Sequence, residues 1–188
     1  MRDLDRFRDA TVPDLIGPGV RLLFVGINPG LWTAAVQAHF ARPGNRFYPA
    51  LFAAGILDRV IDAAHGYTSE DRAYFLSRGL GITNLAARAT ARADELSAEE
   101  LAAGGRRLIQ QVEELAPAVV AVLGISAYRV AFDRRRAVVG RQPERIGPAA
   151  LWVLPNPSGL NAHATLATLA AAYAEAAVAA GITLLERS

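Results

Sequence analysis

Two short loops combine amide side chains with residues that let a backbone turn sharply. The first is the segment 26–30, Gly-Ile-Asn-Pro-Gly, in which Asn28 offers an uncharged amide that can hold a water molecule. Its glycines permit the backbone to approach a ligand closely, and Pro29 restricts the local geometry. Taken alone, Asn-Pro-Gly is also an ordinary turn sequence. The residue types therefore allow chemistry at Asn28 without establishing it.

The second loop is Asn156-Pro157-Ser158-Gly159-Leu160, which follows an apolar run and precedes an alanine-rich stretch. Its apolar tip, Leu160, stands next to a glycine. Such a residue can wedge into a stack of bases and fill the place of a flipped nucleotide. The alternative is an ordinary core contact, which is the usual role of a single leucine.

The composition excludes several kinds of catalysis. The 188 residues include no cysteine, so thiolate nucleophiles, disulfides and cysteine-ligated metals are excluded. All 20 basic residues are arginine, so no lysine amine can form a Schiff base, although the N-terminal amine remains. His39 and His163 are far apart and lack a metal-site spacing. We therefore expect neither a metal ion nor a cofactor.

The net charge of +2 supports nucleic-acid binding only weakly. Arginines are concentrated between residues 129 and 145, where six stand against only Asp133 and Glu144. Guanidinium groups suit phosphate oxygens, but a solvated loop is an equally good interpretation. His163 follows the second loop, where contact with phosphate competes with a plain surface position.

The sequence predicts a cytoplasmic monomer with no membrane segment. No apolar run approaches the ~20 residues that span a bilayer. The first six residues are charged and lack the apolar centre of a secretory signal.

Short apolar runs alternate with helical patterns along the chain. Ser97 and Glu100 form a capping-box pattern at the start of the clearest helix, which Pro117 ends. We expect buried strands at 20–26, 80–84, 118–124 and 150–154, and helices at 45–55 (with Asn45 as N-cap), 70–77, 97–116, 126–132 and 164–180. Residues 31–44 and the polar stretch 86–96 are expected to be irregular, and residues 1–14 to form a loose arm or a short helix.

This alternation predicts an α/β fold, with helices on both faces of a parallel sheet. In such folds the site lies beyond the carboxyl ends of the strands, so the loops after the first and last strands should meet there. No linker or repeat divides the chain, and we expect one domain over residues 1–188, with 1–11 as a loose arm.

Five segments of the chain form an ordered set of motifs: Gly26–Leu31, Arg42–Tyr48, Gly81–Leu85, Gly104–Arg106 and Leu154–Leu160. In order and spacing they resemble the mismatch-specific uracil/thymine DNA glycosylase family, over about residues 12–180. The resemblance implies a three-layer α/β/α sandwich around a short, mainly parallel sheet. It also implies a monofunctional enzyme that flips uracil out of a G:U mispair in double-stranded DNA and hydrolyses the glycosidic bond, leaving an abasic site.

Two residues receive catalytic roles from this resemblance. Asn28 matches the residue that positions the hydrolytic water. A neutral amide is sufficient there, because the sugar becomes a strongly electrophilic cation as the base leaves. Asp94 is a candidate general base or cation stabiliser. Its alternative is a structural role near the N-terminus of the following helix.

The resemblance also implies a pocket for the base. Phe40 matches the aromatic residue on which the base stacks, and backbone N–H groups near Ile27 and Phe40 can meet the base oxygens. Asn84 matches a base-contacting amide suited to uracil O4 and N3–H. Thr33 falls near the C5 edge, where its bulk would crowd a thymine methyl. The expected base-binding residues are Ile27, Thr33, His39, Phe40 and Asn84.

The second loop is the expected DNA contact. Leu160 is the wedge, and Ser158 can meet a phosphate through its hydroxyl or its N–H. Asn161 follows at a position where relatives carry other polar residues. The expected DNA-binding residues are Asn156, Ser158, Gly159, Leu160 and Asn161.

Two alternatives stay open. The same fold can prefer another lesion, such as etheno-cytosine, a deaminated purine or thymine in a G:T mispair. A non-catalytic nucleic-acid or nucleotide-binding module would require loss of the water-positioning residue, whereas Asn28 is present. Dinucleotide and nucleoside-triphosphate sites are disfavoured, because Gly-x-Gly-x-x-Gly after the first strand and Gly-Lys-Ser/Thr are both missing from the sequence.

Overall fold

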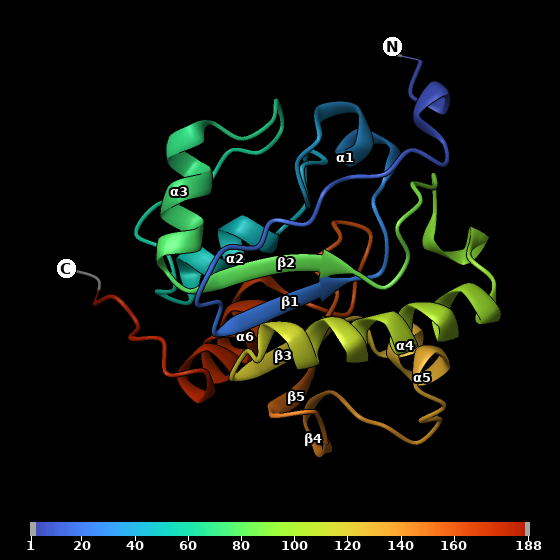
Figure 1. Ribbon diagram of the computed structural model, residues 1–188. Helices are drawn as coiled ribbons and strands as arrows, with labels where there is room; N and C mark the ends of the chain where they lie inside the picture. The colour runs from blue at the N-terminus through green and yellow to red at the C-terminus, as the bar shows by residue number, and fades with distance from the viewer. Residues whose placement is uncertain (1–2, 187–188) are drawn as a thin grey trace.

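One five-stranded sheet forms the centre of the molecule (Figure 1). The computed structural model describes residues 3–186. The strand order is β2-β1-β3-β5-β4, and all neighbours are parallel except β4, which runs antiparallel to β5. The strands are β1 (Leu22–Gly26), β2 (Leu80–Asn84), β3 (Val119–Leu123), β4 (Gly140–Ile146) and β5 (Ala149–Leu154).

Helices connect the parallel strands. The α-helices are α1 (Leu31–Val36), α2 (Phe47–Ala53), α3 (Ser69–Ser77), α4 (Ala98–Leu115), α5 (Ile125–Ala131) and α6 (Leu166–Ala179), and short 3-10 helices cover Asp5–Phe7 and Ala93–Glu95. None of the helices within residues 3–186 has both the length and the hydrophobicity needed to cross a membrane.

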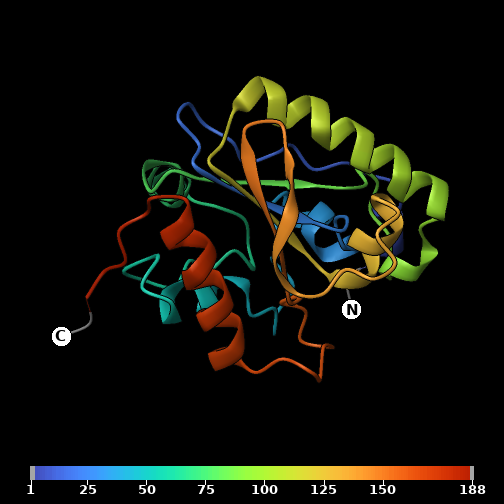
Figure 2. The same cartoon turned by 90° about the horizontal axis from the view of Figure 1, so that it is seen from below.

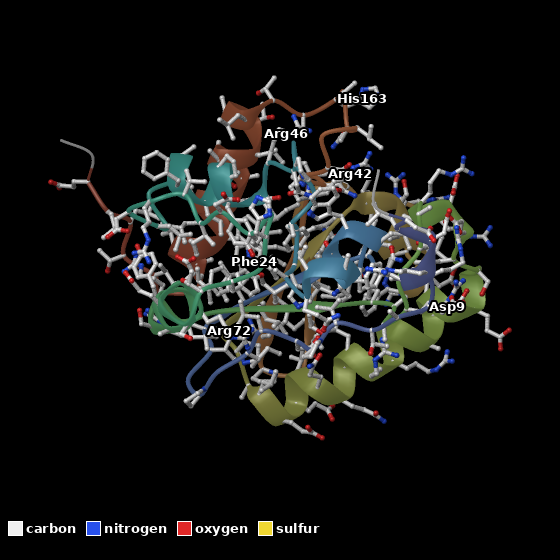
Figure 3. All side chains as sticks on the ribbon, turned by 90° about the horizontal axis from the view of Figure 1, so that it is seen from above. Asp9, Phe24, Arg42, Arg46, Arg72 and His163 are labelled. Carbon is white, nitrogen blue, oxygen red and sulfur yellow. The ribbon has the colours of Figure 1, made fainter. Side chains whose placement is uncertain are left out.

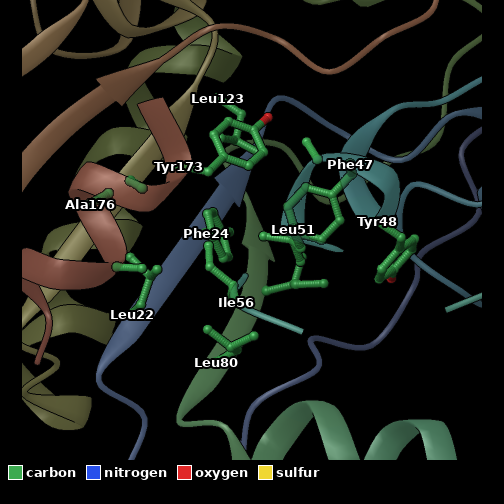
Figure 4. Close-up of a cluster of buried hydrophobic side chains, with 14 of the residues drawn as sticks. Leu22, Phe24, Phe47, Tyr48, Leu51, Ile56, Leu80, Leu123, Tyr173 and Ala176 are labelled. Carbon is green, nitrogen blue, oxygen red and sulfur yellow. The ribbon is translucent and has the colours of Figure 1, made fainter. Parts of the chain in front are cut away.

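Alternate residues of the central strands point to opposite faces of the sheet, and both faces are covered. In β1, Leu22 and Phe24 enter a cluster completed by α2 and α6 (Figure 4), whereas Leu23 and Val25 enter a cluster completed by α4 and α5. All four side chains are fully buried. This arrangement confirms the expected three-layer α/β/α sandwich, and it explains why these strands read as continuous apolar runs.

The helix that begins after Ser97 confirms the capping-box prediction. The Ser97 hydroxyl accepts a hydrogen bond from the Glu100 N–H, and the Glu100 carboxylate accepts one from the Ser97 N–H. The helix continues to Leu115, and Ala116 leaves it in the left-handed conformation just before Pro117. This helix, α4, packs along one face of the sheet.

The structure corrects three local expectations. The stretch 31–44 is not wholly irregular, because its first residues form α1, which is too short to show a helical period. Strand β4 was not expected, since Pro143 and exposed arginines interrupt any apolar pattern. It is an edge strand with an irregular register, where proline and charge are tolerated. Asn45 stands one residue before the N-cap, Arg46, and accepts a hydrogen bond from the Phe47 N–H.

The segment before β1 runs beside β2 and the loop that follows it. The N–H and C=O of Leu15 pair with those of Ile82, and the Asp9 N–H donates to the Ala89 carbonyl. The Ala89 N–H in turn donates to the carbonyl of Ala10. These contacts place residues 9–15 beside β2 and the loop at its carboxyl end.

Candidate active site

The loops that follow β1, β3 and β5 meet at one end of the sheet. A Cβ atom placed on Gly124, just after β3, would lie 3.3 Å from Ile27 Cδ1 and 3.8 Å from Asn156 Nδ2. Ile27, Asn156 and Leu160 line one groove of about 620 Å³. The structure therefore confirms that the two distinctive loops converge beyond the carboxyl ends of the strands.

The orientation of the Asn28 amide is defined by its hydrogen bonds. The two hydrogens of Nδ2 are shared among the carbonyls of Pro29 (3.1 Å) and Arg88 (3.0 Å) and Thr90 Oγ1 (2.8 Å). The two carbonyls can only accept, and Thr90 Oγ1 uses its own hydrogen to donate to the Arg92 carbonyl at 2.7 Å. The amide nitrogen must therefore face this set, and Oδ1, which takes no part in these bonds, is available as an acceptor for water.

The loop after β2 runs alongside the loop that carries Asn28. The Leu85 N–H donates to the Gly26 carbonyl, the Ala86 N–H to the Ile27 carbonyl, and the Thr90 N–H to the Pro29 carbonyl. Backbone contact between the two segments thus continues past the ends of β1 and β2, and Gly30 and Thr90 form an isolated parallel bridge. It brings Thr90 and the Arg88 carbonyl to Asn28.

Arg88 ties this loop to the rest of the structure through its side chain. Its guanidinium contacts Glu100 at 2.5 Å and Asp9 at 3.0 Å. The hydrogen bond from Arg88, together with that from the Ser97 N–H, lowers the pKa of the Glu100 carboxyl to about 2. Arg88 therefore belongs to the Asn28 network through its carbonyl and contacts the cap of α4 through its ion pair with Glu100.

Asn84 ends β2 directly opposite Gly26, and its side chain lies across that glycine. A Cβ atom at Gly26 would come within 2.4 Å of Asn84 Oδ1 and 3.4 Å of Phe40 Cζ. Only glycine leaves room for these two side chains at the end of β1. Phe40 and Asn84, both predicted to bind the base, are thereby brought together beside the Asn28 loop.

His39 contacts Asn84 and is almost fully buried. Its Nε2 lies 2.9 Å from the Pro13 carbonyl, which can only accept, so Nε2 carries the hydrogen. Nδ1 is then an acceptor, and Asn84 Nδ2 lies 3.3 Å from it. Burial lowers the pKa of His39, which favours this neutral form. His39 thus orients the amide of Asn84, which we predicted to hydrogen-bond with the base.

The backbone around His39 is clamped by two tyrosines. The His39 N–H donates to the Tyr67 hydroxyl at 3.0 Å, and the Tyr48 hydroxyl donates to the His39 carbonyl at 3.0 Å. The next residue, Phe40, has a φ of 55°, which is rare for a bulky side chain. Its ring stacks on Phe47 with centroids 4.1 Å apart. Strained backbone held this firmly is typical of functional sites.

Thr33 and Asp94 occupy very different environments. Thr33 is buried in α1, which directly follows the Asn28 loop. The Asp94 side chain is 69% exposed in the 3-10 helix and pairs with Arg92 at 3.0 Å. Ser97 and Glu100 cap α4, so Asp94 does not supply that cap. The catalytic role of Asp94 stays a prediction.

The loop after β5 is folded on itself by short hydrogen bonds. Asn156 Oδ1 accepts from the Ser158 N–H, and Asn161 Nδ2 donates to the Asn156 carbonyl. A Cβ atom at Gly159 would meet the Gly44 carbonyl oxygen at 2.7 Å, so the loop packs closely against the segment before α2. Leu160 stands at the tip and is 78% exposed. Exposure of Leu160 is what the predicted wedge requires, and the wedge role stays a prediction.

The Arg46 guanidinium holds this loop by hydrogen bonds to its backbone carbonyls. Its Nη2 donates to the carbonyls of Ser158 (2.7 Å) and Asn161 (2.8 Å), and its Nη1 donates to the Ala164 carbonyl. The Arg46 N–H also donates to the Pro157 carbonyl. Figure 3 shows Arg46 near His163, which lies on the exposed end of the same loop.

Thr90 and Arg46 are the residues that sequence reasoning missed. Arg46 lies within a quoted motif, but nothing in the local pattern assigns its guanidinium to backbone carbonyls more than 100 residues away. Thr90 lies in a stretch expected to be a polar loop. Its buried, bonded hydroxyl appears only once the two loops are paired.

Comparison with known families agrees with this geometry. Residues 13–178 match the Uracil DNA glycosylase superfamily. The matched range runs from Pro13, which holds His39, to nearly the end of α6. It therefore contains the Asn28 network, the His39–Asn84 pair and the Leu160 loop.

Proposed function

Because this chain belongs to the Uracil DNA glycosylase superfamily, and is thus a DNA glycosylase, we propose that it excises uracil mispaired with guanine in double-stranded DNA. We further propose that it is monofunctional and uses water as the nucleophile. The observation that carries the proposal is the fixed Asn28 amide, in which three acceptors hold Nδ2 and Oδ1 takes no part in these bonds.

The proposed reaction replaces one bond to the sugar with another. The C1′–N1 bond breaks with its electron pair leaving on uracil, and the water oxygen bonds to C1′. Asn28 Oδ1 accepts a hydrogen bond from that water and aims its lone pair at the cationic sugar carbon. In the catalytic interpretation of Asp94, its carboxylate takes the released proton. Full activity of Asp94→Asn with unchanged folding contradicts that role.

The base is proposed to stack on Phe40 and to meet the Asn84 amide. Phe47 supports the Phe40 ring, so the aromatic surface is rigid before the base arrives. Stacking of a base on an aromatic ring is worth roughly 1–3 kcal/mol. One Asn84 amide hydrogen is directed at His39 Nδ1, which leaves the second hydrogen and Oδ1 as a donor and an acceptor for uracil.

Strand scission after alkali tests the reaction. The substrate is a duplex with one G:U mispair, and the proteins are wild type, Asn28→Ala and Asn28→Asp. Wild type should give breaks only after alkali, and Asn28→Ala should lose on the order of 10²-fold in single-turnover rate because the water is no longer positioned. An intact duplex after wild-type treatment overturns the proposal, and breaks without alkali overturn the monofunctional assignment.

The preference for uracil is tested separately with G:U and G:T duplexes. Thr33 is buried in α1, so a thymine methyl directed at it would find little free space. We expect uracil to be released much faster than thymine, and Thr33→Ala to narrow the difference. Comparable wild-type rates on the two duplexes contradict this preference.

A further inference from the structure

A second polar surface lies outside the residues described so far. Among the described residues, a hollow of about 610 Å³ is lined by Arg134, Arg135, Arg136 and Arg141 and by two carboxylates, Asp133 and Glu144. We call these four arginines the arginine surface. Four guanidinium groups against two carboxylates leave an excess of two positive charges at this place.

Most of this charge is open to solvent. Arg134 Nε lies 3.0 Å from Glu144, but Arg135 and Asp133 are 3.8 Å apart with side chains 92% and 89% exposed, so that pair is weak. Within residues 3–186, neither Arg136 nor Arg141 has a carboxylate within 4.0 Å. An anion can therefore approach these residues without first displacing a strong partner.

The backbone that carries the arginine surface is braced from inside. The Arg129 guanidinium donates to the Ala137 carbonyl at 3.0 and 2.7 Å. The buried Gln142 amide donates to the carbonyls of Val138 (2.7 Å) and Gly140 (2.9 Å). These bonds hold the segment between α5 and β4 in one shape. Less backbone freedom is then lost when a ligand binds.

The arginine surface is continuous with the candidate active site. Val138 lines the arginine hollow, and its neighbour Val139 lines the groove that contains Ile27 and Leu160. Gly140 pairs with Val153, so this segment reaches the sheet at the end where β5 enters the Asn156 loop (Figure 2). A long ligand lying over Leu160 can extend across Val139 to the arginines.

We infer that the arginine surface binds backbone phosphates of duplex DNA beyond the flipped nucleotide. This inference rests on the proposed function for the position of the lesion in the groove. Planar guanidinium groups match phosphate oxygens well. Protection of the β4 edge does not explain Arg135 and Arg136, because they precede the strand, and Pro143 and the irregular register already blunt that edge.

Salt-dependent binding tests the inference. The probe is a duplex that extends ten base pairs on each side of a 2′-fluoro-deoxyuridine paired with dG. The fluorine on the sugar of this nucleotide makes its glycosidic bond resist hydrolysis. Affinity is measured by fluorescence anisotropy across a salt series for wild type and R135Q/R136Q. Each lost phosphate contact should reduce the slope of log affinity against log salt by about 0.9, so we expect a reduction of about 1.8.

The matched control is R21Q/R106Q, which removes the same charge from exposed positions just before β1 and on α4. Arg21 directly precedes β1, at the end of the sheet opposite the candidate active site. An unchanged slope in folded R135Q/R136Q overturns the inference, as does an equal reduction in R21Q/R106Q. Polyglutamate is titrated in parallel as a probe for an acidic protein. If R135Q/R136Q loses polyglutamate binding while its DNA slope is unchanged, the surface binds an acidic protein and the inference is overturned. If wild type shows the expected slopes without excising uracil, the proposed function fails and the phosphate contact stands.

Discussion

Asn84 Nδ2 lies 3.3 Å from Nδ1 of the buried His39, and this contact fixes the orientation of both side chains. The Pro13 carbonyl accepts from His39 Nε2, and burial lowers the pKa of His39, which favours the neutral imidazole whose Nδ1 accepts from Asn84. The segment before β1 therefore controls an amide at the end of β2 through one histidine. The arrangement makes the amide sensitive to the protonation of His39.

We expect His39 to make the protein less stable in acid. Burial lowers its pKa below the ordinary value of 6.5; this effect outweighs the hydrogen bond to Pro13 and the charge of Asp14, which both raise the pKa, and is reinforced by Arg72. The unfolded chain then binds a proton more readily, so stability is complete above pH 6.5 and declines as pH falls from 6.5 toward the folded-state pKa. Urea unfolding across pH 5–8 measures this decline.

The matched variants are His39→Gln and His39→Ala. Glutamine can donate to Pro13 and accept from Asn84 without titrating, so it should flatten the pH dependence and retain excision. Alanine should flatten it as well but lose excision, because Asn84 is released. A wild-type pH dependence in His39→Gln would show that other groups cause the decline.

Thr90→Val should impair catalysis through Asn28. Valine has nearly the same shape but cannot accept from Asn28 Nδ2 or donate to the Arg92 carbonyl. The amide then loses one of its three acceptors, and we expect the single-turnover rate to fall by up to about 10²-fold. Thr90→Ser keeps the hydroxyl and serves as the control. Equal rates for the valine and serine variants would remove Thr90 from the network.

Arg46→Met should loosen the loop that carries Leu160. The change leaves three buried or half-buried carbonyls without their donor, and we expect the free energy of unfolding to fall by about 1–3 kcal/mol. Hydrogen exchange should rise in residues 156–164. Arg42→Met, at an exposed position in the same segment, should change neither measurement. Unaltered hydrogen exchange in Arg46→Met would show that the hydrogen bonds within the loop are enough to keep it ordered.

Leu160→Ala should slow excision while leaving the stability of the protein nearly unchanged. The side chain is 78% exposed, so its removal should change the free energy of unfolding by no more than about 0.5 kcal/mol. Excision from duplex DNA should slow by roughly tenfold or more if the leucine fills the vacated stack. Leu166→Ala, 42% exposed at the start of α6, is the control. Full duplex activity of Leu160→Ala contradicts the wedge.

The fold was largely predictable because its signals are local. Apolar runs such as Val119–Leu123 are buried on both sides, and the Ser97–Glu100 capping box marks the start of α4. The missed elements lack such signals. Helix α1 is shorter than two turns, and β4 takes its stability from pairing with β5 rather than from an apolar pattern.

The sequence by itself limited which chemistry is possible: lysine and cysteine are absent, and the motifs that contain Asn28 and Leu160 carry the resemblance that implies hydrolysis. Only the tertiary structure decided which acceptors hold the Asn28 amide and which residue orients Asn84. Thr90 and His39 are 62 and 45 residues from the amides that they contact. Hydrogen bonds over such separations depend on sheet register and loop packing, and neither leaves a local pattern in the chain.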